Sequence, residues 1–313
     1  MDELFRRSSM IKAEAARLGF DSCGISRAGE LTEDANRLEE WLEKGFQASM
    51  SYMENHYQKR INPSLLVEGA KSVISVLLNY YPEETQEDPT APVISKYAYG
   101  KDYHDVIRKK LSHLLEFINT SIAAVKGRGF TDSAPVLDRA WAARAGLGWI
   151  GKNSMLISPS KGSYFFIGAL IVDMELKSDR PIPDFCGDCT RCIHACPTEA
   201  IIEPRIIDSG KCISYHTIEN RGEIDPALKD KFHNRVFGCD ICQDVCPWNR
   251  KSVPHNTEEL KPLTALLKMR KEDWYNLNEE QYNQIFSGSA VKRTGYKGLK
   301  RNLGFLKVEE PGN

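Results

Sequence analysis

Two kinds of apolar pattern alternate along the first 178 residues of the chain. Apolar side chains recur at the spacing of a helix in residues 3–18, 31–44, 103–126 and 138–145. Apolar runs typical of buried strands occupy residues 20–25, 72–80, 130–136, 155–157 and 164–173. Gly19 and Gly45 follow the first two helical segments and are typical helix stops. This alternation predicts the fold class α/β for the N-terminal part of the protein.

A change of pattern after residue 178 marks an expected domain boundary. Residues 181–183 (Pro-Ile-Pro) are typical of a linker, and a cysteine-rich segment follows that closes near Trp248. Residues 260–269 and 279–286 are expected to form helices packed after that segment, and the last residues to be loosely held. The expected parts are a catalytic α/β domain over residues 1–178, a ferredoxin-like domain over 179–250 and a helical segment over 251–313.

Composition places the chain among ordinary globular proteins. Hydrophobic residues make up 41% of it, and 42 basic against 43 acidic side chains leave a formal net charge of −1. The longest apolar stretch, residues 165–172, is too short to cross a bilayer. The Arg6-Arg7 pair is not followed by the apolar segment of an export signal, because charged residues from Lys12 to Arg17 interrupt it. We therefore expect a cytoplasmic protein with reduced thiols and no membrane association.

Eight of the nine cysteines lie between residues 186 and 246, in a pattern that specifies two iron–sulfur clusters. The run Cys-x2-Cys-x2-Cys-x3-Cys-Pro that starts at Cys186 matches bacterial ferredoxins, in which three thiolates bind one [4Fe-4S] cube and the fourth binds its neighbour. A second run from Cys239 has only three cysteines, and Cys212 completes the count. Exchange of the fourth ligands assigns Cys186, Cys189, Cys192 and Cys246 to cluster one, and Cys196, Cys212, Cys239 and Cys242 to cluster two.

Two paired Cys-x2-Cys motifs also occur in zinc ribbons, which are the alternative interpretation. Zinc binds four ligands at each site, which explains neither the triple repeat nor the two Cys-Pro pairs. Two adjacent low-potential clusters indicate one-electron transfer. Cys23 stands outside both runs and is expected to be a small buried strand residue.

Two short motifs resemble cofactor sites but lack the required context. Gly146-x-Gly148-x-x-Gly151 matches the dinucleotide fingerprint, yet it follows a helical segment and leads into a strand, the reverse of a Rossmann site. We expect instead a Gly-rich turn that a large ligand can approach closely. Asp102-x-His104 resembles the start of a cobalt-coordinating motif, but its glycine position is occupied by a different residue, so no histidine ligation is expected. His104 is either a helix N-terminal residue beside Asp102 or a pocket residue.

Several segments resemble the epoxyqueuosine reductase family, in order along the chain. The longest similarity runs from Asp132 to Ala140 (DSAPVLDRA) and continues from Ala145 to Asn153 (AGLGWIGKN). Residues 79–81, 97–104 and 286–293 and both cysteine runs are also similar to that family. The resemblance therefore covers nearly the whole chain.

The resemblance implies a cobalamin-binding α/β domain, related to that of reductive dehalogenases, followed by a ferredoxin-like domain with two [4Fe-4S] clusters. The implied reaction is the last step of queuosine synthesis, reduction of epoxyqueuosine to queuosine at the wobble position of tRNAs for Tyr, His, Asp and Asn. An external low-potential electron donor and a monomer are expected. Some members of the family carry C-terminal helical repeats, which this chain lacks. A corrinoid reductive dehalogenase-like enzyme and a ferredoxin-type electron carrier are the alternatives.

The resemblance also implies roles for individual residues. Asp132 is the expected proton donor, which requires a carboxyl group that burial keeps protonated near neutral pH. Tyr103 is a candidate second acid or substrate contact, and Asp138 a helix N-terminal carboxylate with which Arg139 pairs. The candidate cobalamin contacts are Arg60, Asp132, Lys152, Ser154 and Thr217.

One segment has the charge expected of an RNA contact. Residues 281–308 contain six basic side chains and no acidic one, with Tyr296 among them as a stacking platform. We expect the tRNA anticodon arm to bind there, with an affinity that falls steeply with salt. The expected contacts are Lys292, Arg293, Lys297, Lys300 and Arg301.

Overall fold

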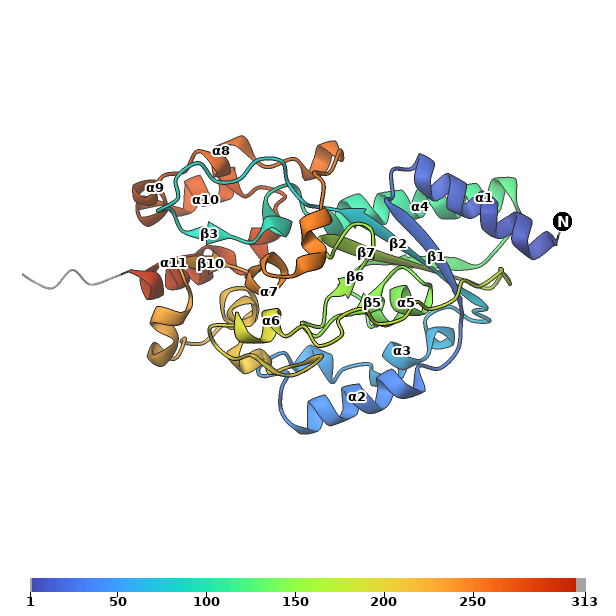
Figure 1. Cartoon of the computed structure of the whole chain (residues 1–313). Helices are drawn as coiled ribbons and strands as arrows, with labels where there is room; N and C mark the ends of the chain where they lie inside the picture. The colour runs from blue at the N-terminus through green and yellow to red at the C-terminus, as the bar shows by residue number, and fades with distance from the viewer. Residues whose placement is uncertain (1, 308–313) are drawn as a thin grey trace, which may run out of the picture.

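The computed structural model describes residues 2–307, and a four-stranded antiparallel sheet forms the centre of its N-terminal part (Figure 1). In spatial order the strands are β1 (Ser22–Arg27), β2 (Ser72–Asn79), β7 (Phe165–Val172) and β4 (Gly127–Phe130). Every residue of β2 is buried, because helices cover both faces of the sheet. Helices and strands thus alternate as the pattern predicts, although no two neighbouring strands of this sheet are parallel.

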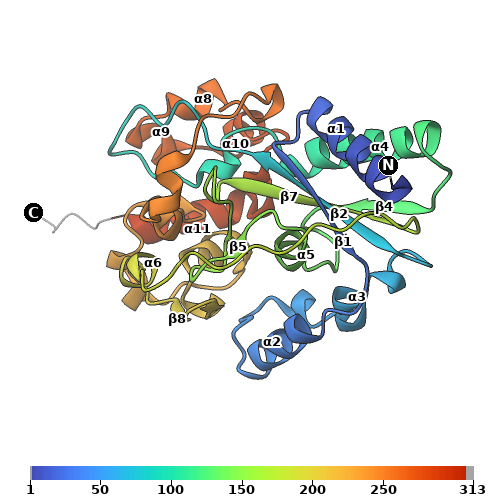
Figure 2. The same ribbon diagram turned by 45° about the vertical axis from the view of Figure 1, so that its right-hand side comes forward.

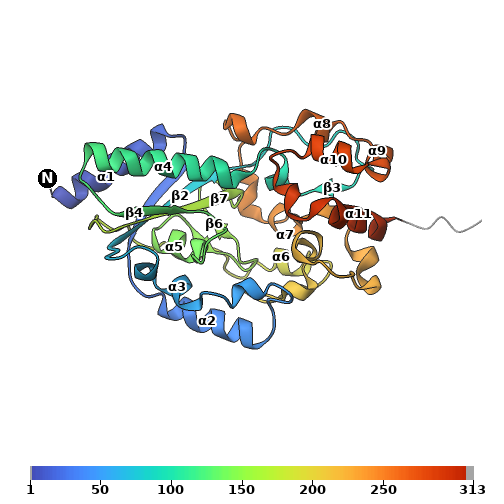
Figure 3. The same cartoon turned by 180° about the vertical axis from the view of Figure 1, so that it is seen from behind.

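The helices form a layer on each face of the sheet (Figures 1 and 3). One layer consists of α1 (Glu3–Arg17) and α4 (Tyr103–Ser121), which pack through residues such as Ile11 and Leu111. The other layer contains α2 (Thr32–Glu43), α3 (Tyr57–Ile61) and α5 (Asp138–Arg144). Trp141 of α5 is almost fully buried there.

The cysteine-rich part lies at one end of this three-layer unit (Figure 2). Two short helices, α6 (Arg191–His194) and α7 (Ile241–Asp244), pack against each other, and each lies within one of the two cysteine runs. Between them lie the hairpin of β8 (Ile201–Glu203) and β9 (Ile206–Ile207), and a π-helical turn, Tyr215–Glu219. The double-cluster architecture expected after residue 179 is therefore built from short elements joined by loops.

A second hydrophobic core joins distant parts of the chain. The short strand β3 (Val93–Ile94) pairs in parallel with β10 (Arg235–Phe237). Around this pair pack α8 (Thr264–Leu267), α9 (Lys271–Asn276), α10 (Glu279–Ile285) and α11 (Gly295–Leu306). Residues from the predicted first and third domains thus share one core, and the predicted boundaries remain a prediction.

Helix α11 is packed firmly against the rest of the protein, and the expectation of loosely held last residues falls on residues 308–313, outside the described part of the chain. Leu299 and Leu303 are buried in the second core, and the buried Asn302 amide donates to the carbonyl oxygens of Thr217 and Val236, both at 2.9 Å. Because two buried carbonyl groups depend on one side chain, α11 is fastened to the cluster-binding part.

The predicted strand over residues 130–136 is shifted. Strand β4 ends at Phe130, and Thr131 turns its hydroxyl to the carbonyl oxygen of Ile167 on β7, 3.2 Å away. Asp132 then adopts a φ of +46°, in the left-handed region that strands do not use. The predicted helix over residues 103–126 ends early, at Ser121. Among residues 2–307, no helix is both long and apolar enough to cross a membrane.

Candidate active site and cluster-binding region

Asp132 stands in the loop between β4 and α5, at a backbone position that is held from both sides. Its N–H donates to Oδ2 of Asp138, the first residue of α5, at 3.2 Å. The left-handed φ of Asp132 is unfavourable for most side chains and is tolerated best by Asp, Asn and Gly. Non-glycine residues in this region gather at functional sites, where the surrounding structure maintains them.

Three side chains from the start of α4 meet the Asp132 carboxylate or its partner. The Tyr103 hydroxyl donates to Oδ2 of Asp132 at 2.6 Å, and Nε2 of His104 lies 3.5 Å from the same oxygen. Nδ1 of His104 lies 2.6 Å from Oδ1 of Asp102, the N-cap of α4. His104 is thus both a helix N-terminal residue and a pocket residue, since its ring connects two carboxylates.

The Tyr103 ring is fixed by stacking. Its centroid lies 4.1 Å from that of Phe166 on β7 with an interplanar angle of 6°, and 4.2 Å from the imidazole of His104. A ring packed on both faces presents its hydroxyl group in one direction. The sheet and the start of α4 therefore fix the position of the Asp132 carboxylate.

The hydrogen bonds around His104 determine where a proton resides. Burial alone would lower the pKa of His104, but its hydrogen bonds to Asp102 and Asp132 outweigh burial and raise that pKa to about 9. Burial alone would raise the pKa of Asp132, but hydrogen bonds from His104 and Tyr103 lower it below its usual value. In this arrangement the neighbouring donors stabilise the carboxylate of Asp132, and its protonation by burial beside a bound corrin stays a prediction. The imidazolium of His104 holds the proton beside it.

Asp138 contributes a second carboxyl group to the site. Burial, together with the charge of Asp132, raises the pKa of Asp138 to about 7. Within residues 2–307 its Oδ1 is buried without a hydrogen-bond partner. The predicted pairing with Arg139 does not form, because the Arg139 guanidinium donates to the carbonyl oxygen of Ser154. The position of Asp138 at the N-terminal end of α5 is as predicted.

The Asp132 side chain is accessible to solvent. It is 67% exposed, yet burial by surrounding protein is the largest influence on its pKa. The charge of Asp132 contributes to the raised pKa values of Tyr52 and Arg293. The Arg293 guanidinium lies 6.0 Å from the centre of the Tyr52 ring. Arg293 is held by two hydrogen bonds to Glu219, at 3.0 and 2.9 Å. No sequence motif pointed to Tyr52 or Glu219, since segments far apart in the chain bring them here.

Two of the predicted cobalamin contacts have structural roles. Arg60 is buried and donates to the carbonyl oxygens of Tyr52 at 2.6 Å and Asn55 at 3.2 Å. Thr217 is fully buried, donates to the carbonyl oxygen of Ile213 at 2.7 Å and accepts from the N–H of Gly238 at 2.9 Å. The Thr217 hydroxyl is thus used by backbone groups, whereas Arg60 keeps further N–H donors. A contact of either residue with cobalamin stays a prediction.

The other predicted contacts lie between the two main parts of the protein. Nζ of Lys152 donates to the carbonyl oxygen of Gly187 at 2.6 Å. Ser154, at a φ of +61°, donates its hydroxyl to the carbonyl oxygen of Arg205 at 2.9 Å. Together they connect the catalytic unit to the cysteine-rich part. A contact of either residue with cobalamin stays a prediction.

The glycine run before Lys152 is needed for close packing. The hairpin of β5 (Trp149–Ile150) and β6 (Leu156–Ile157) follows it, so no helix starts there and the reverse order noted in the sequence is confirmed. A Cβ atom at Gly148 would collide with the carbonyl oxygen of Ile157, and one at Gly146 with that of Arg180. The backbone thus approaches other backbone at these two glycines, and the expected approach of a ligand to the turn stays a prediction.

The four cysteines of the predicted first cluster surround one small cavity. This cavity, of about 100 Å³, is lined by Cys186, Cys189, Cys192 and Cys246 together with the rings of Phe185 and Trp248. The indole N–H of Trp149 donates to Sγ of Cys186 at 3.3 Å. Within residues 2–307, no three His, Cys, Asp or Glu side chains converge as ligands of a single metal ion. Ligands of a four-iron cube stand further apart than those of one ion.

The other four cysteines lie close to one another and deeper in the protein. Burial raises the pKa of the Cys239 thiol to about 12 and that of Cys242 well above its usual value, and Cys212 adds to both shifts. Burial also raises the pKa of Cys212, and the charge of the neighbouring Cys196 thiolate adds to that shift. Cys192 acts on Cys242, so the two groups adjoin. This grouping follows the crossed assignment made from the sequence, and Cys23 lies apart in β1.

The basic residues near the C-terminus differ in their surroundings. Lys297 is exposed, and its ammonium group makes no hydrogen bond or ion pair with the described part of the chain. Lys292 is exposed over the ring of Tyr282, whereas Lys300 donates to the carbonyl oxygen of Tyr275. Tyr296, the expected stacking platform, is half-buried and donates to the carbonyl oxygen of Leu277.

Arg301 corrects the predicted tRNA surface. Its guanidinium donates to the carbonyl oxygens of His216, Asn220 and Gly222, each at 2.7 Å. Three carbonyl groups at the end of the π-helical turn are thereby satisfied by one side chain. Arg301 fastens α11 to the cluster-binding part, and its charge is directed inward.

We expect the Arg301→Ala variant to lose about 2–4 kcal/mol of unfolding free energy, because three carbonyl groups, two of them on buried residues, lose a charged donor. Thermal unfolding of the reconstituted protein measures the loss. Lys297→Ala, on the same helix, is the matched control and should change stability by less than about 0.5 kcal/mol. Equal stability of the two variants would contradict the structural role of Arg301.

Comparisons with known proteins agree along the whole chain. A family model described as "Epoxyqueuosine reductase QueG, DUF1730" matches residues 60–133, and one described as a 4Fe-4S double cluster binding domain matches residues 185–249. An epoxyqueuosine reductase of Cellulophaga algicola is 57% identical over 302 residues, which cover 96% of this chain and 98% of that protein. A crystal structure of an epoxyqueuosine reductase with an epoxyqueuosine-modified tRNA-Tyr stem loop is similar with a TM-score of 0.90 and 30% identity, over 96% of this chain and 80% of the other. A structure of the Bacillus subtilis enzyme, with its catalytic aspartate loop swung out of the active site, has a TM-score of 0.89 and 29% identity, over 96% of this chain and 81% of that one.

Proposed function

The chain belongs to the epoxyqueuosine reductase family, and we propose on this basis that it reduces epoxyqueuosine to queuosine at the wobble position of tRNA. The reaction opens the epoxide, forms the cyclopentene double bond, consumes two electrons and two protons, and releases water. It completes queuosine synthesis in tRNAs for Tyr, His, Asp and Asn. The observation that carries the proposal is the 57% identity over 96% of the chain.

Two [4Fe-4S] clusters supply the electrons one at a time, in the domain matched by the double-cluster family model. We assign Cys186, Cys189, Cys192 and Cys246 to the first cluster, and Cys196, Cys212, Cys239 and Cys242 to the second. The shared cavity of the first four thiols and the proximity of the other four support this assignment.

Cobalamin is the cofactor that the family implies, and the acceptor groups around Asp132 fit a ligand rich in amide groups. The Asp132 carboxylate is accessible, and the buried Oδ1 of Asp138 has no partner among the described residues. Lys152 and Ser154 would contact the cofactor at the edge that faces the cluster-binding part. When bound, cobalamin in its cobalt(I) form supplies a strong nucleophile and two-electron reductant.

The chain itself supplies the proton. Asp132 lies at the accessible end of a chain of hydrogen bonds, with the imidazolium of His104 behind it and Asp102 behind His104. A proton that Asp132 donates is replaced from His104, because Nε2 of His104 lies 3.5 Å from Oδ2 of Asp132. Tyr103 keeps that carboxylate oriented through its hydroxyl group.

The turnover rate should follow the protonation of His104. His104 is charged in the folded protein up to about pH 9, and the rate should fall as the pH rises through that value. In the His104→Gln variant, which keeps an N–H donor, the plateau should drop about tenfold and the limb near pH 9 should disappear. Single-turnover rates between pH 6 and pH 10 test this. An unchanged alkaline limb in the variant would assign it to another group.

The raised pKa also contributes to stability. The unfolded chain releases the His104 proton near pH 6.5 and the folded protein near pH 9, so the folded state binds it more tightly. The stabilisation is complete below about pH 6.5 and is lost as the pH rises through about 9. Unfolding of the His104→Gln variant over the same pH range provides the control for the rate profile.

The tRNA substrate is expected to contact both α11 and the surroundings of Asp132. We propose that Lys292, Arg293 and Lys297 contact the anticodon arm, because they are exposed on the side that leads to Asp132 through Arg293 and Tyr52. Arg301 is excluded from this set by its inward contacts. The protein is proposed to act in the cytoplasm as a monomer, with an external low-potential electron donor.

The function is tested by anaerobic turnover of tRNA carrying epoxyqueuosine, with reconstituted protein, a strong reductant and cobalamin. Mass spectrometry of the digested tRNA should show queuosine only when cobalamin is present. Failure to form queuosine with intact clusters and bound cobalamin would contradict the proposal and favour a related reductive reaction on another substrate.

A further inference from the structure

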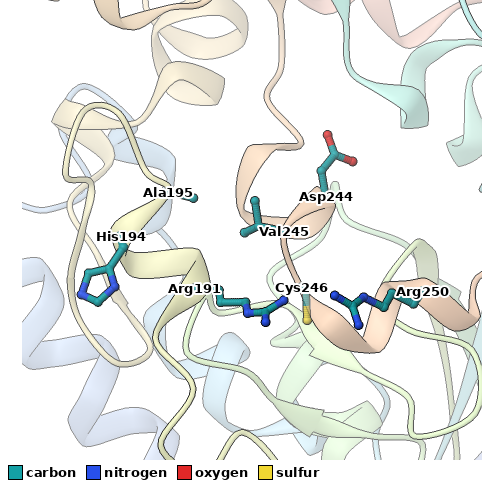
Figure 4. A pocket seen from close by; sticks show the side chains of 7 residues that line it. All are labelled: Arg191, His194, Ala195, Asp244, Val245, Cys246 and Arg250. Carbon is teal, nitrogen blue, oxygen red and sulfur yellow. The ribbon is translucent and has the colours of Figure 1, made fainter.

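A charged cavity opens on the surface beside the first cysteine group. It has a volume of about 570 Å³ and lies between α6 and α7 (Figure 4). Its lining residues are Arg191, His194, Ala195, Asp244, Val245, Cys246 and Arg250. None of these residues contacts Asp132, and the proposed reaction assigns the cavity no role.

Cys246 connects this surface cavity to the predicted cluster. Its thiol lines both the surface cavity and the smaller cavity that the four cysteines of the first group surround. In Figure 4 its sulfur atom lies between the guanidinium groups of Arg191 and Arg250. The two cavities thus adjoin, with Cys246 and Arg191 in the lining of both. Electron transfer weakens with distance, which makes this surface a short route to the first cluster.

The charge of the cavity is positive. Arg191, His194 and Arg250 are exposed, and neither guanidinium makes a hydrogen bond or ion pair with residues 2–307. Asp244 is the one acidic residue of the lining, and its carboxylate is neutralised by Lys96 at 2.6 Å. An arginine without a protein partner beside an accessible cavity is available to a carboxylate from another molecule.

An apolar margin completes the surface. Phe185, 48% exposed, belongs to the lining of the cluster cavity, and Val245 lines the charged one. Transient electron-transfer complexes are small, with an apolar contact and charges that steer the encounter. The combination of cations, an apolar margin and a nearby cluster ligand is what such a complex requires.

We infer that this cavity is the docking site of an acidic one-electron carrier protein, which presents carboxylates around its redox centre. The inference rests on the proposed function, since it names the entry point for the electrons that the reduction consumes. In each encounter one electron passes from the reduced carrier to the oxidised first cluster, so the carrier is oxidised and the cluster reduced, and no proton moves. Two encounters supply one turnover.

The test compares two reductants with holoprotein and an Arg191→Glu/Arg250→Glu variant. The first reductant is an acidic plant-type [2Fe-2S] ferredoxin, with a potential of about −400 mV. The second is reduced methyl viologen, a small cation that gains nothing from arginine side chains. Stopped-flow absorbance follows cluster reduction. The control of equal charge change is Arg27→Glu/Lys109→Glu, which reverses two exposed charges on β1 and α4.

Reduction by ferredoxin should slow about tenfold or more in the double variant. Methyl viologen should reduce the clusters of the double variant at least as fast as it reduces those of the unchanged protein. The wild-type ferredoxin rate should fall with rising salt. An unchanged ferredoxin rate with intact clusters would overturn the inference, as would a wild-type rate that salt does not affect. If the double variant lost affinity for tRNA but kept its rate of reduction by ferredoxin, the inference would also be overturned, and the arginines would be assigned to phosphate contacts.

If the double variant does not retain its iron, Arg250→Gln serves in its place, because it removes one charge four residues away from Cys246. Turnover with methyl viologen keeps the two proposals distinguishable. If it yields no queuosine even with the unchanged protein, the proposed function fails. If it does yield queuosine while ferredoxin docking is insensitive to the arginines, only the docking site fails.

Discussion

Replacement of Asp132 by Asn is expected to lower the rate of queuosine formation by about 10²–10⁴-fold, the usual contribution of a positioned proton donor. The amide has nearly the shape of the carboxyl group, and its oxygen can still accept from the Tyr103 hydroxyl. It cannot, however, pass a proton from His104 to the substrate. Anaerobic single-turnover measurement with epoxyqueuosine-containing tRNA gives the rate directly.

The control for this variant is Asp138→Asn. Asp138 accepts from the N–H of Asp132 through Oδ2, and an amide oxygen can keep that bond. Its rate should therefore fall much less than that of Asp132→Asn, with clusters and tRNA affinity unchanged in both. An Asp132→Asn rate within about threefold of wild type would remove Asp132 from the proton path.

Replacement of Cys196 by Ala is expected to remove the second cluster, although Cys196 belongs to the first cysteine run. The variant should lose about half of the bound iron, and its remaining electron paramagnetic resonance signal should equal that of Cys239→Ala. Turnover should stop, because no complete path for electrons remains. The physical reason is the proximity of Cys196 to Cys212, while Cys246 lines the cavity of the first group.

Two further variants make the cluster assignment decisive. Cys186→Ala should lose the first cluster and retain the second. Its residual signal should therefore differ from that of Cys196→Ala. Cys23→Ala should retain both clusters, because Cys23 lies in β1 and outside both groups. If Cys196→Ala matched Cys186→Ala instead, each run would bind its own cluster and the crossed assignment would be wrong.

The regular elements of the N-terminal part could be predicted because their patterns are local. Strand β2 is mostly apolar and is buried along its length, and α5 begins at Asp138 as expected. The second core could not be predicted in this way. Strand β3 has only two residues, and its partner β10 lies in another part of the chain. A pair so short is stabilised by tertiary packing and leaves no periodic signal in the sequence.

The candidate site was predictable in its members but not in its charges. Asp132, Tyr103 and His104 meet as the motifs suggested. The protonation of Asp132 depends on three donors and acceptors from a different element, and a spacing pattern does not contain that information. For the same reason Arg301, selected for its charge, proved to be satisfied by backbone carbonyl groups. Charge in a sequence does not reveal the direction in which a side chain points.

The parallel pairing of β3 with β10 restricts the order in which the protein can fold during synthesis. Ile94 emerges from the ribosome about 140 residues before its strand partner, and Leu299 of α11, which closes the same core, emerges later still. Until then the apolar residues of the β3 region have no core to enter, and such exposed segments promote aggregation. Completion of this core must therefore wait until α11 has been synthesised. A nonsense mutation between β7 and α11 would leave the central sheet complete but this region uncovered, a substrate for chaperones and proteases.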